Sequence, residues 1–239
     1  MDIYGLSHVG AVRHNNEDRF VIRELPFGAV LLAVMDGMGG EASGEYASKI
    51  AADALERAEW SCASPARLAE LALSANREIL AEAARNPELE GMGTTLTAVV
   101  ARDTTAYWVS VGDSRLYLYR GGVLSQITRD HRFLQAFLDD GEMSAEEAKR
   151  HPLRNMLDQC VGSPYCAPDT GAFALREGDV LLLCTDGLND EVPHGDLATA
   201  LPLEASARGK TERLLRIALE RGGRDNITIV VGVMAPGGE

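Results

Sequence analysis

The sequence contains no long apolar run. Across its 239 residues, no stretch approaches the roughly 18 consecutive apolar residues that a membrane-spanning helix needs. The first residues, Met1-Asp2-Ile3-Tyr4-Gly5, also lack the basic and then apolar pattern of a secretory signal peptide. We therefore expect no membrane partner and a cytoplasmic location.

Positive charge and paired cysteines are scarce as well. Asp and Glu outnumber Lys and Arg by 36 to 23, which gives a formal net charge of -13 and argues against nucleic acid as a partner. The four cysteines form no CxxC motif, so we expect reduced thiols that serve in packing. The acidic excess either keeps the protein soluble or includes carboxylates that need cations, and charge alone does not decide between these.

The organisation of the chain favours one domain, because the sequence has no repeat, low-complexity tract or long linker. We expect this domain to span residues 1–234 and a disordered tail to follow at 235–239. Many short strands joined by tight turns, with two consecutive long helices, favour an antiparallel α+β fold over a doubly wound sheet. Apolar runs predict strands at 29–35, 95–100, 107–111, 180–184 and 227–233, with weaker strand patterns at 19–23, 115–119 and 171–175.

Helical spacing and capping residues predict the helices. Ser64 followed by Pro65 is typical of a helix N-cap with proline at the first helical position. Ser144 with Glu147 three residues later is typical of a capping box. The predicted helices span 43–59, 65–85, 132–139 and 205–221, with a short further helix after Ser144.

Aspartates stand at the ends of several predicted strands. Asp36 and Asp186 each follow an apolar run and precede a glycine, Asp113 ends the run at 107–112, and Asp225 comes just before the last strand. In antiparallel sheets the end of one strand lies near the start of its neighbour. We therefore expect these four carboxylates to lie at one edge of the core.

Two interpretations of these aspartates remain open. Asp-Gly after an apolar run is typical of a hairpin turn. Four carboxylates gathered beside apolar strands, however, repel one another and lose hydration, which a bound cation relieves. An all-oxygen ligand set selects Mg²⁺ or Mn²⁺ over zinc, and no HExxH motif or Cys/His spacing offers a zinc site. The residues alone thus indicate a possible carboxylate metal site.

Six short segments stand in a characteristic order along the chain. They are Arg13-His14-Asn15-Asn16-Glu17-Asp18, Asp36-Gly37-Met38-Gly39-Gly40, Gly93-Thr94-Thr95, Gly112-Asp113-Ser114-Arg115, Thr185-Asp186-Gly187-Leu188 and Asp225-Asn226-Ile227-Thr228. Together they resemble the PPM family, the metal-dependent type 2C serine/threonine protein phosphatases. Each motif alone is weak, but six in register are highly specific, and the resemblance extends from about residue 5 to residue 233.

The resemblance implies both a fold and a metal centre. The expected fold is two packed, mostly antiparallel β-sheets flanked by helices on both faces. A centre of two Mn²⁺ or Mg²⁺ ions is expected at one end of the sandwich. By resemblance, Asp36 bridges both ions, the carbonyl of Gly37 binds one, and Asp186 and Asp225 bind the other. Asp113 matches a position that contributes to a third, weaker ion in bacterial members.

Further residues around the ions receive roles from the same resemblance. Glu17 and Asp18 would orient metal-bound waters, and Arg13 would grip the substrate phosphate with a bidentate fork. Water held between two divalent ions loses a proton near neutral pH and attacks phosphorus in line. Asn226 either positions a water or a phosphate oxygen, or caps the turn before the last strand.

One departure from the family concerns the general acid. Animal members carry a histidine directly after the Asp-Gly pair, where this chain has Met38. We expect the five histidines to be loop or structural residues, with His14 or a metal-bound water as the remaining candidates for the acid. A polar insertion at about 128–154 resembles the flap that lies beside the active site in bacterial members; the alternative is a surface helical hairpin.

These observations lead us to expect a protein-serine/threonine phosphatase. It would be a monomer that hydrolyses phosphoserine and phosphothreonine in proteins and opposes a bacterial Ser/Thr kinase. One alternative is an inactive pseudophosphatase that keeps the fold as a binding module, although this would require loss of a metal ligand. Another alternative is a small-molecule phosphoesterase.

Overall fold

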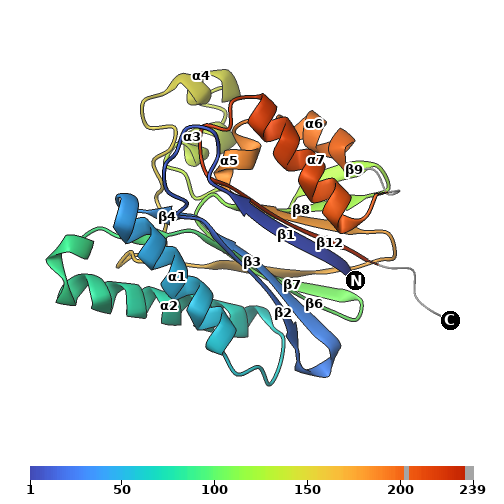
Figure 1. The fold of residues 1–239 in the computed structure, drawn as a ribbon, viewed down its shortest axis with the longest axis horizontal. Coiled ribbons are helices and arrows are strands. Elements are labelled where there is room, and N and C mark those ends of the chain that lie inside the picture. The colour runs from blue at the N-terminus through green and yellow to red at the C-terminus, as the bar shows by residue number, and fades with distance from the viewer. Residues whose placement is uncertain (202–204, 235–239) are drawn as a thin grey trace.

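Two five-stranded β-sheets form the centre of the molecule (Figure 1). The computed structural model describes residues 1–201 and 205–234, so the tail expected at 235–239 lies outside the described residues. Neighbouring strands of both sheets pair antiparallel. The first sheet has the order β1 (Asp2–His8), β12 (Ile227–Val233), β11 (Val180–Cys184), β8 (Arg115–Arg120) and β9 (Val123–Gln126). The second has the order β10 (Asp169–Ala174), β7 (Thr105–Val111), β6 (Leu96–Arg102), β3 (Ala29–Met35) and β2 (Arg19–Leu25).

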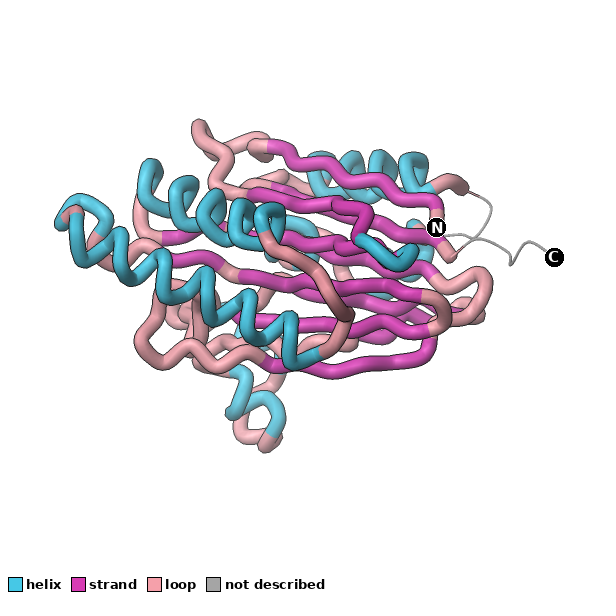
Figure 2. The backbone as a smooth tube through the Cα atoms, turned by 90° about the horizontal axis from the view of Figure 1, so that it is seen from below, coloured by secondary structure: helices cyan, strands magenta, loops and turns pink. Residues whose placement is uncertain are grey.

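Helices cover the outer faces of both sheets (Figure 1), and Figure 2 shows from below how long helices lie across the strands. The second sheet packs against α1 (Glu41–Arg57) and α2 (Pro65–Arg85). The first sheet packs against α5 (Asp186–Asn189), α6 (His194–Ala200) and α7 (Ala207–Glu220). This confirms the expected α+β class with two packed antiparallel sheets and helices on both faces.

Smaller elements lie around one end of the sandwich. A two-stranded ribbon of β4 (Gly37–Met38) and β5 (Gly93–Thr94) continues from the end of β3. The short helices α3 (Gln135–Asp139) and α4 (Ala145–Arg150) lie at the same end, away from the chain termini (Figure 1). Two 3₁₀ turns, Pro26–Gly28 and Pro87–Leu89, complete the regular structure.

The central strands read as continuous apolar runs because both of their faces are buried. In β3, Leu31 and Ala33 pack against the helices of the second sheet. Leu32 and Val34 point the other way and pack between the two sheets. The alternation of apolar and polar residues that marks a half-buried strand is therefore missing from the sequence. The strand is predicted from the length of the apolar run instead.

The predicted helix starts have the expected capping contacts. The Ser64 hydroxyl accepts a hydrogen bond from the backbone N–H of Arg67, and Pro65 follows at the first helical position. The Ser144 and Glu147 side chains form both hydrogen bonds of a capping box at the start of α4. Both capping predictions are confirmed.

The structure differs from the sequence prediction at short or edge elements. We did not predict β1 and β9, which are edge strands, or the two-residue strands β4 and β5, which are too short to show a period. The helix predicted from residue 132 begins instead at Gln135, because Arg132 forms an isolated β-bridge with Leu157. Among the helices of residues 1–201 and 205–234, none combines the length and apolar character needed to cross a bilayer.

Candidate active site

Asp36 is fixed at the end of β3 by the Gly93-Thr94-Thr95 motif. Its backbone N–H donates to the Thr95 hydroxyl at 3.0 Å, and the Thr95 N–H donates to the Asp36 carbonyl at 2.8 Å. The Thr94 hydroxyl donates to the same carbonyl at 2.9 Å. With the main chain held on both sides, Asp36 is positioned by the sheet rather than by a flexible turn.

Two glycines allow the neighbouring segments to approach closely. A Cβ atom on Gly37 would lie 2.2 Å from the carbonyl oxygen of Gly44, so only glycine lets β4 lie against the start of α1. A Cβ atom on Gly187 would lie 2.0 Å from the carbonyl oxygen of Asn226. The second contact brings the segment of Asp186 against the turn that precedes β12.

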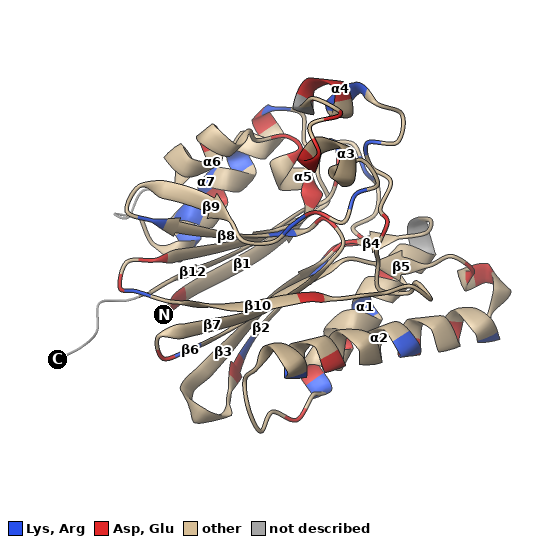
Figure 3. Cartoon of the chain, turned by 180° about the vertical axis from the view of Figure 1, so that it is seen from behind, with Lys and Arg blue, Asp and Glu red and all other residues tan. Residues whose placement is uncertain are grey.

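The structure brings the strand-end aspartates to one end of the sandwich, where Figure 3 shows acidic residues around α5 and α4. Asp36 lies within the electrostatic reach of Asp18, Asp113, Asp186 and Asp225. Burial first, and then repulsion by these four carboxylates, raises the pKa of Asp36 well above its ordinary value. Burial and neighbouring aspartates raise the pKa of Asp186 in the same way. The carboxylates of the cluster thus outweigh the opposing charge of Arg132, which acts to lower the pKa of Asp186.

Asp18 is the most deeply buried carboxylate of this group, with 1% of its surface exposed. Its Oδ2 accepts a hydrogen bond from the Thr185 hydroxyl at 2.8 Å, whereas its Oδ1 has no hydrogen-bond partner. Burial raises the pKa of Asp18 to about 7. A buried acceptor oxygen without a donor fits a nearby cation or a water bound to one.

Two arginines border the cluster. The Arg13 Nη2 lies 2.8 Å from Oδ2 of Asp225, and the Arg13 side chain is 53% exposed. The Arg132 Nε lies 2.7 Å from Oδ2 of Asp113, and its side chain is 16% exposed. We did not predict Arg132; the only signal was its place two residues after Asp130 in a polar stretch, and nothing local points to Asp113.

The donor set fits a hard divalent cation in charge and in chemistry. Its ligand atoms are carboxylate and carbonyl oxygens, which suit Mg²⁺ and Mn²⁺. Within the described part of the chain, no three His, Cys, Asp or Glu side chains already form a metal cage. The aspartates are gathered but not closed around one point, so their side chains must adjust to coordinate an ion.

Asn226 joins the final turn to the loop that carries Arg13 and Glu17. Its Oδ1 accepts from the Glu17 N–H at 2.9 Å, and its Nδ2 donates to the carbonyls of Val9 at 3.0 Å and Asn15 at 2.8 Å. The Asn226 side chain thus orders the backbone of the loop at 9–17 rather than capping the turn before β12, and its role in positioning a water or a phosphate oxygen stays a prediction. Glu17 thereby lies near the site, where its charge acts on both Arg13 and Asp18.

The Asp113 loop is held by its neighbours. The Ser114 hydroxyl hydrogen-bonds the Thr95 hydroxyl at 2.7 Å, and Arg115 forms a bidentate ion pair with Asp130. His131 is buried, and its Nδ1 accepts from the Gly112 N–H at 3.2 Å. These contacts agree with the expected structural roles of Ser114, Arg115 and His131. The His8, His151 and His194 rings also contact backbone groups.

A cleft of about 590 Å³ opens beside the aspartates. It lies between the segment 128–154, which carries α3 and α4, and the helix α5 with the turn before β12. Both polar and apolar side chains line it. Arg132, Arg154, Asp186, Asp190 and Asp225 are among the residues that line it.

Comparison with known proteins agrees with this geometry. The family model for protein phosphatase 2C matches residues 5–227. The chain is 40% identical over 225 residues to the serine/threonine protein phosphatase PstP of Mycobacterium tuberculosis, covering 93% of this chain but only 43% of PstP. It is 34% identical over 231 residues to the serine/threonine phosphatase stp of Listeria monocytogenes, covering 93% of this chain and 91% of stp.

Solved structures show the same likeness. A crystal structure of the PstP catalytic domain in complex with two manganese ions superposes with a TM-score of 0.87. It shares 36% sequence identity, and the match covers 98% of each chain. This chain belongs to the protein phosphatase 2C family of metal-dependent serine/threonine protein phosphatases.

Proposed function

We propose that this chain hydrolyses phosphoserine and phosphothreonine in proteins with the help of two Mn²⁺ or Mg²⁺ ions. The observation that carries the proposal is the position of Asp36, within the electrostatic reach of four other aspartates. Family membership supports the same activity, as does a relative that binds two manganese ions.

In this proposal the carboxylates of Asp36, Asp186 and Asp225 and the Gly37 carbonyl would hold the two ions, with Asp36 serving both. Asp113 is the candidate ligand of a third and weaker ion. When bound, such ions lower the pKa of a water and neutralise charge on the phosphate. The backbone of Asp36 is fixed, so that binding an ion needs adjustment of its carboxylate but little rearrangement of the sheet.

Arg13 is the proposed phosphate-binding residue. Its guanidinium is half exposed, at the edge of the cluster, and its Nη2 already contacts one carboxylate oxygen of Asp225. A guanidinium has five N–H donors, so Arg13 can keep this contact and still donate two hydrogen bonds to phosphate oxygens. Asp225 would thus orient Arg13, while Glu17 and Asp18 orient waters at the ions.

The cleft is the proposed seat of the protein substrate. It is open to solvent and bordered by the segment 128–154, whose helices α3 and α4 have only five and six residues. Helices this short depend on packing for stability, so we propose that this segment adapts to a protein surface. We further propose that residues 1–234 form one catalytic unit, monomeric and cytoplasmic, which opposes a Ser/Thr kinase.

The decisive experiment compares Asp36→Asn with Asp103→Asn. Both variants change one Asp to Asn, but Asp103 lies on an exposed turn with its side chain 80% exposed. We expect Asp36→Asn to lose at least about 1,000-fold in kcat on a phosphothreonine peptide with Mn²⁺, because a bridging ligand serves both ions. Asp103→Asn should match the wild type. Full activity of the wild type in chelator would contradict the proposal, and inactivity with every divalent ion would favour a pseudophosphatase.

A further inference from the structure

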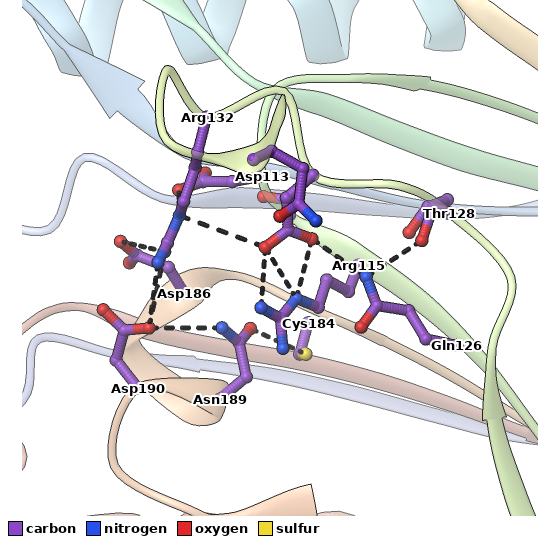
Figure 4. Close-up of polar contacts among 12 residues, drawn as sticks. Asp113, Arg115, Gln126, Thr128, Arg132, Cys184, Asp186, Asn189 and Asp190 are labelled. Carbon is purple, nitrogen blue, oxygen red and sulfur yellow. Dashed lines mark hydrogen bonds and ion pairs between the residues drawn. The ribbon is translucent and has the colours of Figure 1, made fainter. Parts of the chain in front are cut away.

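Arg132 places a positive charge among three carboxylates of the cluster (Figure 4). Its Nε donates to Oδ2 of Asp113 at 2.7 Å. Its Nη2 lies 3.4 Å from Oδ1 of Asp190 and 3.6 Å from Oδ2 of Asp186. One guanidinium therefore faces three carboxylates, and the local charge stays negative.

The base of the Arg132 side chain is anchored on both sides. The His131 N–H donates to the Gly112 carbonyl at 3.0 Å, directly beside the Asp113 loop. The Phe133 N–H donates to the Met156 carbonyl at 2.8 Å, which closes the segment 128–154 at its root. The backbone of Arg132 is therefore fixed next to Asp113, and only its side chain has freedom to leave the carboxylates.

Arg132 is not required to neutralise its other acidic neighbour. Asp130 already forms a bidentate ion pair with Arg115, at 2.8 and 2.6 Å, whereas the Arg132 Nε lies 4.0 Å from it. The close contact of Arg132 is with Asp113, whose side chain is 6% exposed. Arg132 thus supplies the nearest positive charge to a carboxylate that burial alone would make costly to ionise.

We propose that Arg132 is a built-in counter-cation that competes with a divalent ion for Asp113 and Asp190. A guanidinium and a metal ion cannot occupy the same space between these carboxylates, so an ion reaches Asp113 only when the Arg132 side chain swings away. The site at Asp113 is then weak because the resident charge must first be displaced. This inference rests on the proposed function in one respect, namely that the competing ion is Mn²⁺ or Mg²⁺.

The test replaces Arg132 by the neutral residue Gln and counts bound Mn²⁺ by isothermal titration, with free Mn²⁺ followed by EPR. Removing one positive charge within about 4 Å of a partly buried anion strengthens cation binding by at least about tenfold. We expect Arg132→Gln to bind one more Mn²⁺ than the wild type in the same concentration range, or to bind its weakest ion at least about tenfold more tightly. Adding Asp113→Asn to Arg132→Gln should abolish this gain.

Arg129→Gln is the matched control. Arg129 lies in the same segment, and its substitution by Gln changes the net charge by the same amount. Its side chain, however, is 51% exposed and pairs with Asp139. It should bind Mn²⁺ like the wild type. If Arg132→Gln and Arg129→Gln bind the same number of ions with the same affinities, the inference is wrong.

A second substitution protects the test against misfolding. Arg132→Lys keeps a positive charge but loses the planar fork, so it should bind the additional ion less tightly than Arg132→Gln and more tightly than the wild type. If Arg132→Gln does not fold, an unchanged titration of Arg132→Lys overturns the inference. If the wild type binds no Mn²⁺ at all, the proposed function fails; if only the gain on substitution is missing, Arg132 is a structural ion pair.

Discussion

Asp18 offers a direct test of whether charge in the acidic cluster lowers the free energy of unfolding when no metal ion is bound. It is buried, one of its carboxylate oxygens has no hydrogen-bond partner, and burial raises its pKa from 3.8 to about 7. Without a cation, ionised Asp18 therefore opposes folding. We expect Asp18→Asn to make the metal-free protein more stable above pH 7, because the substitution removes the charge and keeps an oxygen that can accept from the Thr185 hydroxyl.

The magnitude follows from the two pKa values. Between pH 4 and pH 7 the folded protein holds a proton on Asp18 that the unfolded chain has released, so the free energy of unfolding falls as the pH rises. The loss is complete above pH 7. A difference of about three in pKa corresponds to about 4 kcal/mol, or a decrease of about 10 °C in the melting temperature of a protein of this size.

The assay is thermal unfolding between pH 5 and pH 8 in excess chelator, followed by circular dichroism. Asp103→Asn is the control, because the Asp103 side chain is 80% exposed and pairs with Arg102, which is also exposed. We expect the melting temperature of the control to fall as pH rises, and that of Asp18→Asn to fall less, so that the two differ most at pH 8. Saturating Mn²⁺ should restore the control at pH 8 and help Asp18→Asn less. Equal pH dependence of the two proteins would refute the argument.

Three further results are expected. Thr95→Val should lower the free energy of unfolding by about 1–3 kcal/mol in urea titrations and weaken Mn²⁺ binding, because it leaves the part-buried N–H of Asp36 without its acceptor. Arg120→Met should cost about 2–4 kcal/mol of stability, since Asp179 is 1% exposed and would keep the Arg176 N–H donor but lose its charged partner, yet activity on p-nitrophenyl phosphate at 25 °C should not change. Replacing 128–154 by the corresponding segment of a related phosphatase should change kcat/KM on a phosphoprotein far more than on p-nitrophenyl phosphate. Equal losses on both substrates would show that this segment supports the metal site instead.

The positions of the aspartates could be predicted because each depends on a local signal. Asp36 and Asp186 stand where an apolar run ends, and such a run must be a buried strand when both of its faces are covered. Antiparallel pairing of β11 with β12 then places Asp186 beside Asp225, whereas Asp36 follows a strand of the other sheet and reaches them only because the two sheets pack together. The same logic failed at β1 and β9, which lie at the edges of the first sheet and carry no continuous apolar run.

Arg132 could not be predicted because its partners are set by tertiary packing alone. Asp113 lies 19 residues before it and Asp186 lies 54 residues after it, and no motif connects the three. The helical pattern at 132–139 even argues for a different conformation, which the bridge between Arg132 and Leu157 overrides. Local patterns predict which carboxylates lie together. The position of the guanidinium that balances their charge is set only when segments far apart in the sequence pack together. The charge balance of this site therefore depends on the fold. Substitutions at Arg132 should change the affinity for Mn²⁺, although Arg132 belongs to none of the six sequence motifs.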